Sequence, residues 1–99
     1  MALLKTTIEA DDIITIRTVN GFEIVAKFVS ESASSIKVNQ PLLVTGASTI
    51  KESGNVKVLW GKLGETFGTL GDVEVNSVNI LMADETDETI ATQYTTQVS

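Results

Sequence analysis

The chain has 99 residues, of which 42% are hydrophobic, and its seven basic and thirteen acidic side chains give a net charge of −6 at pH 7. This length predicts a single domain over residues 1–99, with a core too small to make a monomer very stable. The absence of cysteine and histidine excludes disulfides, thiol nucleophiles, zinc fingers and histidine-based catalytic or metal sites.

Residues 13–44 predict three antiparallel strands, because apolar and polar side chains alternate over them with a period of two. The strands are expected over residues 14–17, 22–29 and 36–44. Asn20-Gly21 lies between the first two and is a strong hairpin signal, which predicts positive φ at both positions. Pro41 predicts an edge, a bulge or a break in the third strand, because proline has no amide hydrogen.

The following residues predict a loop and then further strands, so that all strands lie within about residues 13–83. The loop is expected over residues 46–55, and the extended segments follow at residues 56–60, 73–75 and 78–82. In the last segment, one face is expected to carry Val78, Ile80 and Met82. Trp60 is expected in the core or at a subunit interface rather than as a platform for stacking bases.

An acidic C-terminal helix is expected over about residues 86–97. Thr86 is a suitable N-cap, and Asp87 and Glu88 lie where the helix dipole favours anions. The apolar side chains recur every four residues, at Ile90, Tyr94 and Val98. A helix of about twelve residues is marginal alone, so this stripe is expected to dock on the rest of the domain.

The charge is unevenly distributed along the chain. All seven basic residues lie within residues 1–62, where six acids nearly balance them, whereas residues 63–99 contain seven acids and no base. The acidic part is either a solvated surface or an element that repels nucleic acid or recruits a basic partner. No segment has the roughly 18 consecutive apolar residues of a membrane span, and residues 1–5 lack the pattern of a signal peptide. We therefore expect a cytoplasmic protein without a membrane partner.

The candidate catalytic motifs do not support an enzyme. Four glycines lie within residues 61–71, but Gly61-Lys62 is not followed by the Ser or Thr of a phosphate-binding loop, so a flexible connection is expected. The adjacent carboxylates of Asp11-Asp12 and of residues 84–88 do not converge on one substrate, since neighbours in a strand point to opposite faces. We therefore expect no catalytic residue, no cofactor and no metal site.

The basic residues of the predicted strands suggest a binding surface. Arg17, Lys27 and Lys37 alternate with core positions on consecutive strands, so they are expected to share one face or one rim of the sheet. A shared basic strip is the minimum that contact with nucleic-acid phosphates requires. The alternative is that these are ordinary solvent-facing residues that pair with Glu23 or Glu31.

Residues 13–38 resemble the first motif of the Sm and Sm-like superfamily. That motif has a tight glycine turn after strand one, a small residue within strand two, an apolar residue two positions later, and a turn into strand three. The chain supplies these features in order, as Asn20-Gly21, Ala26, Phe28, the turn through Ser32, and Ile36-x-Val38. The second motif is placed at residues 75–81. With residues 87–94 included, the pattern is most similar to the small Sm-like proteins of marine bacteriophages, cyanophages in particular.

This resemblance implies a small, mainly β fold: a strongly bent five-stranded barrel with a short C-terminal helix. It also implies a homo-oligomeric ring of five to seven subunits, with five favoured, in which strand pairing between subunits satisfies open sheet edges. The expected function is non-catalytic binding of single-stranded RNA or DNA. The alternative is a phage structural or assembly scaffold, whose ring contacts proteins.

The expected binding residues depart from the family's RNA pocket. That pocket uses an acidic residue and often an asparagine at the turn between strands two and three, and a basic residue in the second motif. Here small polar residues fill both turns: Ser32, Ser34, Ser35, Asn76 and Ser77. They are expected either to bind bases and phosphates, together with the strip of Arg17, Lys27 and Lys37, or to be plain turn residues. A phage origin would place the protein in the host cytoplasm.

Overall fold

The computed structural model describes residues 8–49, 51–54, 56–62 and 72–98. These residues form one antiparallel sheet, whose strands are β1 (Ile13–Thr18), β2 (Glu23–Glu31), β3 (Ser35–Thr49), β4 (Val56–Lys62), β5 (Asp72–Asn76) and β6 (Ile80–Glu85). A one-turn 3-10 helix, η2 (Ser77–Asn79), joins β5 to β6, and a helix, α1 (Glu88–Val98), follows β6.

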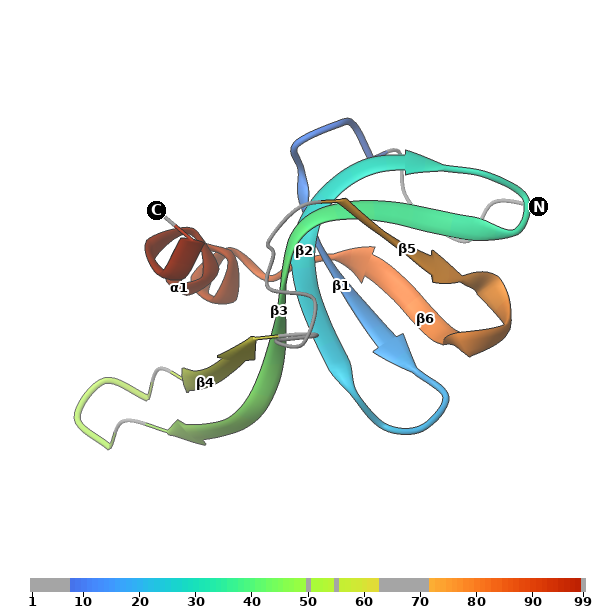
Figure 1. Ribbon diagram of the computed structural model, residues 1–99. Helices are drawn as coiled ribbons and strands as arrows, with labels where there is room; N and C mark the ends of the chain where they lie inside the picture. The colour runs from blue at the N-terminus through green and yellow to red at the C-terminus, as the bar shows by residue number, and fades with distance from the viewer. Residues whose placement is uncertain (1–7, 50, 55, 63–71, 99) are drawn as a thin grey trace.

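The sheet curls strongly into a half-barrel (Figure 1). The strand order is β4-β3-β2-β1-β6, and β5 pairs with β3 off this path. Because β3 is long, it pairs with β5 over residues 35–39 and with β4 over residues 42–49. The prediction of a mainly β, strongly bent barrel-like fold with a short C-terminal helix is therefore confirmed.

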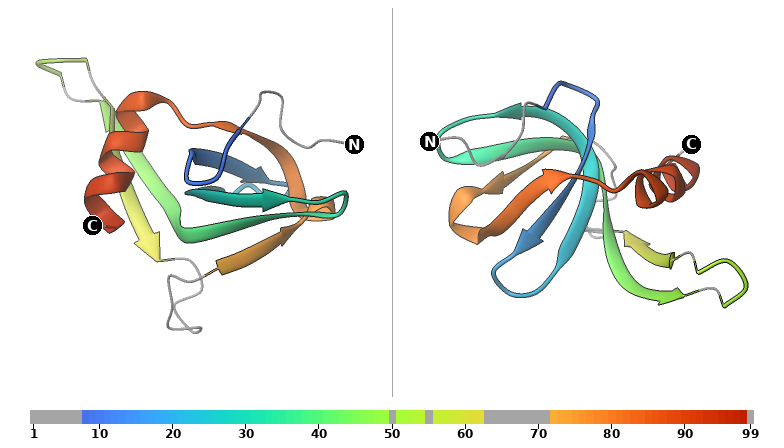
Figure 2. Two further views of the ribbon diagram at one scale, coloured as in Figure 1. Left: turned by 90° about the horizontal axis from the view of Figure 1, so that it is seen from above. Right: turned by 180° about the vertical axis from the view of Figure 1, so that it is seen from behind.

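A bulge bends β3 at Gln40-Pro41. Gln40 has a φ of +51°, and the register between β2 and β3 shifts between the pairs of Val25 and Lys27. A bulge inserts an extra residue and sharpens the bend of a strand, and a proline there costs no ladder hydrogen bond. Beyond it, the end of β3 and β4 project from the half-barrel as a hairpin (Figures 1 and 2). We call this hairpin the arm (described residues 44–49, 51–54 and 56–60).

A tight hairpin turn joins β1 to β2, as the Asn20-Gly21 pair predicts. The N–H of Thr18 donates to the carbonyl of Phe22 (2.8 Å), and the N–H of Gly21 donates to the carbonyl of Thr18 (3.1 Å). Gly21 has a φ of +93°, whereas Asn20 does not have a positive φ. The expectation of positive φ at both positions is therefore wrong. The loop is instead a three-residue turn that ends in one left-handed glycine.

The inner face of the half-barrel holds the main apolar core. Its buried members are Ile14, Ile16, Ile24, Ala26, Phe28, Ile36, Val38 and Ala83. The set includes Ile24, Ala26 and Phe28, which alternate along β2 and therefore share one face. Fully burying one large aliphatic side chain contributes about 1.5–3 kcal/mol, so this cluster stabilises the half-barrel.

A second, smaller core lies where α1 packs against the sheet. Tyr94 of α1 is fully buried together with Val25 and Leu42, and the other stripe residues of α1 flank it. The Tyr94 hydroxyl donates to the carbonyl of Gln40 (2.5 Å). Its ring meets Trp60 edge-on, with centroids 6.0 Å apart. The predicted apolar stripe is thus confirmed, and Trp60 is half-buried in this second core.

Several strand boundaries differ from the sequence expectation, and two of the differences change which side chains are exposed. β3 continues to Thr49, where a loop over residues 46–55 is expected, because this polar segment pairs with β4. The last strand begins only at Ile80, since Ser77–Asn79 form η2. Val78 therefore does not share the core face with Ile80, and its side chain is 75% exposed. Met82 is also exposed, because it lies opposite Arg17 on the outer face.

The start of α1 also differs from the expectation. Thr86 is not the N-cap: it is buried, and its hydroxyl is hydrogen-bonded to that of Thr15 (2.8 Å). Asp87 serves instead, since its Oδ2 accepts the N–H of Thr89 (3.1 Å), and the helix begins at Glu88. Most of the expected glycine-rich connection, residues 63–71, lies outside the described residues.

Candidate nucleic-acid interface

The two turns rich in serine and asparagine lie side by side at one end of the half-barrel. Ser35 pairs with Asn76 in the β3–β5 ladder. The N–H of Ser77 donates to the carbonyl of Ser34 (2.8 Å). The structure thus brings together all five polar residues that sequence analysis places in two separate motifs: Ser32, Ser34, Ser35, Asn76 and Ser77.

Polar groups of the β2–β3 turn are largely engaged within the turn itself. The Ser32 hydroxyl accepts the backbone N–H groups of Ser34 (3.3 Å) and Ser35 (3.1 Å). The hydroxyl oxygens of Ser32 and Ser35 lie 3.2 Å apart and are hydrogen-bonded. These contacts are typical of serines that stabilise a turn, so Ser32 and Ser35 have little free capacity for a ligand.

The second turn leaves more hydrogen-bonding capacity. Asn76 uses its Oδ1 to accept the N–H of Val78 (3.2 Å) and so caps η2. Its side-chain amide donors make no hydrogen bond within the described part of the chain, and neither do the hydroxyls of Ser34 and Ser77. These three side chains are the groups of the site that remain available to a ligand.

The three predicted cations project from the outer face of consecutive strands. Arg17, Lys27 and Lys37 each alternate with residues of the inner core on β1, β2 and β3. They therefore lie on one face of the sheet. Arg17 is exposed, whereas Lys27 and Lys37 are half-buried.

Carboxylates interrupt this strip of cations. Arg17 forms an ion pair with Glu23 at 2.8 Å, which confirms one of the pairings considered from the sequence. Lys37 lies directly opposite Glu74 in the β3–β5 ladder.

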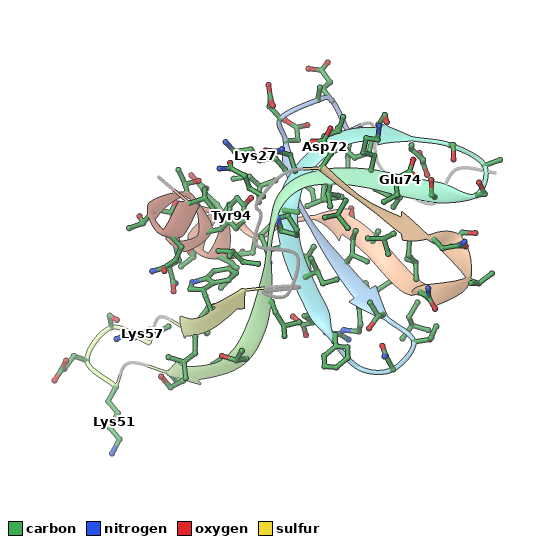
Figure 3. The ribbon with its side chains drawn as sticks, in the orientation of Figure 1. Lys27, Lys51, Lys57, Asp72, Glu74 and Tyr94 are labelled. Carbon is green, nitrogen blue, oxygen red and sulfur yellow. The ribbon has the colours of Figure 1, made fainter. Side chains whose placement is uncertain are left out.

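Lys27 also has an acidic residue nearby along the sheet. It lies opposite Asn39, whose Nδ2 donates to Oδ1 of Asp72 (2.9 Å). Figure 3 shows Lys27, Asp72 and Glu74 in this part of the sheet. The outer face is therefore a surface of mixed sign rather than a purely basic one.

Two lysines on the arm were not singled out from the sequence. Lys51 and Lys57 are exposed and project from the arm (Figure 3), and neither forms an ion pair with the other described residues. The Val56-Lys57-Val58 alternation indicates that Lys57 points outward. The sequence does not predict the arm, however, because most of the first strand of the arm lies in the segment expected to be a loop.

Five large apolar side chains are exposed at the same end of the half-barrel as the two turns. They are Val19 (58% exposed), Phe22 (51%), Val78 (75%), Leu81 (65%) and Met82 (41%). The N–H of Val19 donates to the carbonyl of Asn79 (2.9 Å), which ties the β1–β2 turn to η2. Exposed apolar side chains on segments that lie side by side are candidates for an interaction surface.

An open pocket of about 430 Å³ lies beside the start of α1. Its lining includes four acidic residues, Asp11, Asp12, Glu85 and Glu88. Within the described residues, no group of three or more such side chains is placed to hold a metal ion. The acidic lining repels phosphate, so this pocket does not belong to the candidate nucleic-acid site.

No model of a known protein family matches the chain, and no curated protein matches its sequence. In the described ranges, none of the helical segments has the length and apolar character needed to cross a bilayer.

Proposed function

We propose that this protein is a non-catalytic, Sm-like ring that binds single-stranded RNA or DNA in nucleic-acid processing. The observation that carries the proposal is the junction of the two turns through Ser77 and Ser34. In the family that the sequence resembles, the corresponding turns form the RNA pocket. The proposal includes a phage origin and therefore action in the host cytoplasm.

Two open sheet edges support assembly into a ring. Within the described residues, β5 pairs only with β3, and β6 pairs only with β1. Unpaired backbone groups along such edges favour pairing with another chain. In the proposed ring, β5 of one subunit pairs with β6 of the next. The ring has five to seven subunits, with five favoured.

The edge of β4 is less available for this purpose. The Gln93 side chain of α1 accepts the N–H of Val58 (2.9 Å) and donates to the carbonyl of Val56 (2.7 Å). Two such bonds occupy backbone groups that a neighbouring strand would otherwise use. This cover leaves β5 and β6 as the edges for pairing between subunits.

Binding is tested by fluorescence anisotropy with labelled oligo-U and oligo-dT at about 50 and 200 mM salt. We expect binding that weakens as salt rises, because contacts with phosphates release counterions. The Ser34→Ala/Ser77→Ala variant removes two available hydroxyls and should weaken binding several-fold, whereas Thr89→Ala on α1 is the control. No binding of either strand at low salt would contradict the proposal.

The cationic contact is tested by two charge reversals of equal size. Lys27→Glu/Lys37→Glu reverses two cations of the outer face, and Lys51→Glu/Lys57→Glu reverses two on the arm. If the outer face contacts phosphates, the first variant loses affinity and part of its salt dependence, and the second does not. Loss in the second variant alone would place the contact on the arm.

A second candidate function is a phage structural or assembly scaffold whose ring contacts proteins. The five exposed apolar side chains and the net charge of −6 favour this candidate. It predicts the ring without nucleic-acid binding. Light scattering after size exclusion measures the mass of the assembly. A monomeric mass would contradict both candidates, because both require a ring.

A further inference from the structure

The apolar end of the half-barrel has three side chains that do not belong to the open edges. Val19 and Phe22 lie at the β1–β2 turn, and Val78 lies on η2. The hydrogen bond between Val19 and Asn79 holds these two segments together, and Figures 1 and 2 show them at the same end. We call Val19, Phe22 and Val78 the end patch; each is more than half exposed.

The end patch belongs to two segments of the chain that carry no charge, and the charged side chains that flank the β1–β2 turn, Arg17 and Glu23, neutralise each other in an ion pair. Residues 18–22 and residues 76–83 contain no acidic or basic side chain, although 20% of the whole chain is charged. Elsewhere the net charge of −6 makes two copies repel each other. An uncharged apolar end is therefore where two copies approach at the lowest electrostatic cost.

We propose that the end patch is an isologous interface, in which the patches of two copies of this chain meet about a two-fold axis. Such an interface must be complementary to itself, which excludes a patch of one strong charge and suits an apolar one. Contact between the two patches removes the most exposed large apolar side chains of η2 and the β1–β2 turn from water.

The end patch is also preorganised for contact. The β1–β2 turn is closed by the bond from the N–H of Thr18 to the carbonyl of Phe22. η2 is capped by the side chain of Asn76. Because these segments are already ordered, association loses little backbone entropy, and less of the contact energy is spent on ordering.

This interface goes beyond the ring and does not require nucleic-acid binding. Pairing of β5 in one subunit with β6 in the next runs head to tail and closes a ring. A two-fold contact between end patches instead joins two identical assemblies and doubles the number of subunits. A ring of five would become a pair of rings, and a chain that forms no ring would become a dimer. The wild-type subunit number is therefore expected to be even.

The test is the mass of the full chain by light scattering after size exclusion. Val78→Asp and, separately, Val19→Asp place a charge in the end patch and should halve the mass. Both positions are exposed, so the circular dichroism spectrum should not change. Leu59→Asp on the arm, where the native side chain is 52% exposed, is the matched control and should leave the mass unchanged.

Salt provides a second reading of the same assembly. The wild-type mass should persist at about 1 M salt, because salt screens the repulsion between acidic copies and does not weaken apolar contact. An odd subunit number, an unchanged mass in both patch variants, or dissociation at high salt would overturn the interface. A ring whose mass is unchanged in both patch variants would overturn only this inference, whereas a wild-type dimer that both patch variants convert to a monomer would overturn only the ring.

Discussion

The half-barrel and the arm are held in place by different kinds of interaction. Eight buried apolar residues from the strands share the core of the half-barrel. In the described arm, by contrast, Val58 is the buried residue, and Gln93 and the Trp60–Tyr94 contact attach the hairpin to α1. A segment with few buried contacts opens at a lower free energy than the global unfolding. Stability therefore resides in the half-barrel, while the arm is the part that can adapt.

The largest test of this contrast is a truncation in each region. Ile16→Ala removes a fully buried side chain of the half-barrel and should lower the free energy of unfolding by about 2–5 kcal/mol, through lost burial and a residual cavity. Leu59→Ala removes an exposed side chain of the arm and should change it by less than about 0.5 kcal/mol. Urea unfolding followed by circular dichroism measures both. Equal losses would mean that the arm is as much a part of the core as β1.

The joint between the two regions is tested by pH through Tyr94. Burial raises the pKa of the Tyr94 hydroxyl from 10.0 to about 12, against a smaller opposing effect of a backbone hydrogen bond with Lys27. The folded state therefore holds this proton more tightly than the unfolded state. The resulting stability is fully present below pH 10 and is lost as pH rises through 12, by about 2–3 kcal/mol.

Tyr94→Phe separates this effect from the titration of lysines. The variant loses the hydrogen bond to the carbonyl of Gln40, which should cost about 1 kcal/mol at neutral pH. Its free energy of unfolding should then fall less than that of the wild type between pH 10 and 12, because both proteins share every other titrating group. If the free energy of unfolding falls equally in the two proteins between pH 10 and 12, the pKa of Tyr94 is not raised by burial.

The attachment of the arm is tested at Gln93. Gln93→Ala removes both hydrogen bonds to the edge of β4 and should lower stability by about 1 kcal/mol. The specific readout is hydrogen exchange at the Val58 amide, which donates to Gln93 (2.9 Å) and should exchange faster in the variant. Gln97→Ala, at an exposed position of the same helix, is the control. Unchanged protection of Val58 would show that β4 does not depend on α1.

Sequence patterns predicted the half-barrel better than the arm, for a physical reason. The core of β1, β2 and the start of β3 depends on alternation within each strand, which is visible locally, as at Ile24, Ala26 and Phe28. The stripe on α1 is equally local. Residues 46–49, in contrast, are extended because they pair with β4, and their small polar side chains carry no signal of that pairing.

The candidate site shows the same division. Each turn was predicted from its own serines or asparagine, but their contact depends on pairing between β3 and β5, more than thirty residues apart. The ion pair of Arg17 with Glu23 follows from the register of the β1–β2 hairpin and is one of the pairings that the sequence suggests. The exposure of Val78 cannot be predicted in this way, because a 3-10 turn in an apolar stretch has the same composition as a strand.

The smallest expected effect concerns the charged surface of the half-barrel. Arg17 and Glu23 lie 2.8 Å apart, with side chains 49% and 39% exposed. Solvent screens such a pair, so a double-mutant cycle of Arg17→Ala and Glu23→Ala should give a coupling of about 0.2–1 kcal/mol that decreases with salt. A larger coupling that does not change with salt would mean that the ion pair on the outer face, and not only the apolar core, contributes substantially to stability. A small one leaves that face free to exchange an internal partner for a phosphate at little cost, which is the property that the proposed binding of single strands requires.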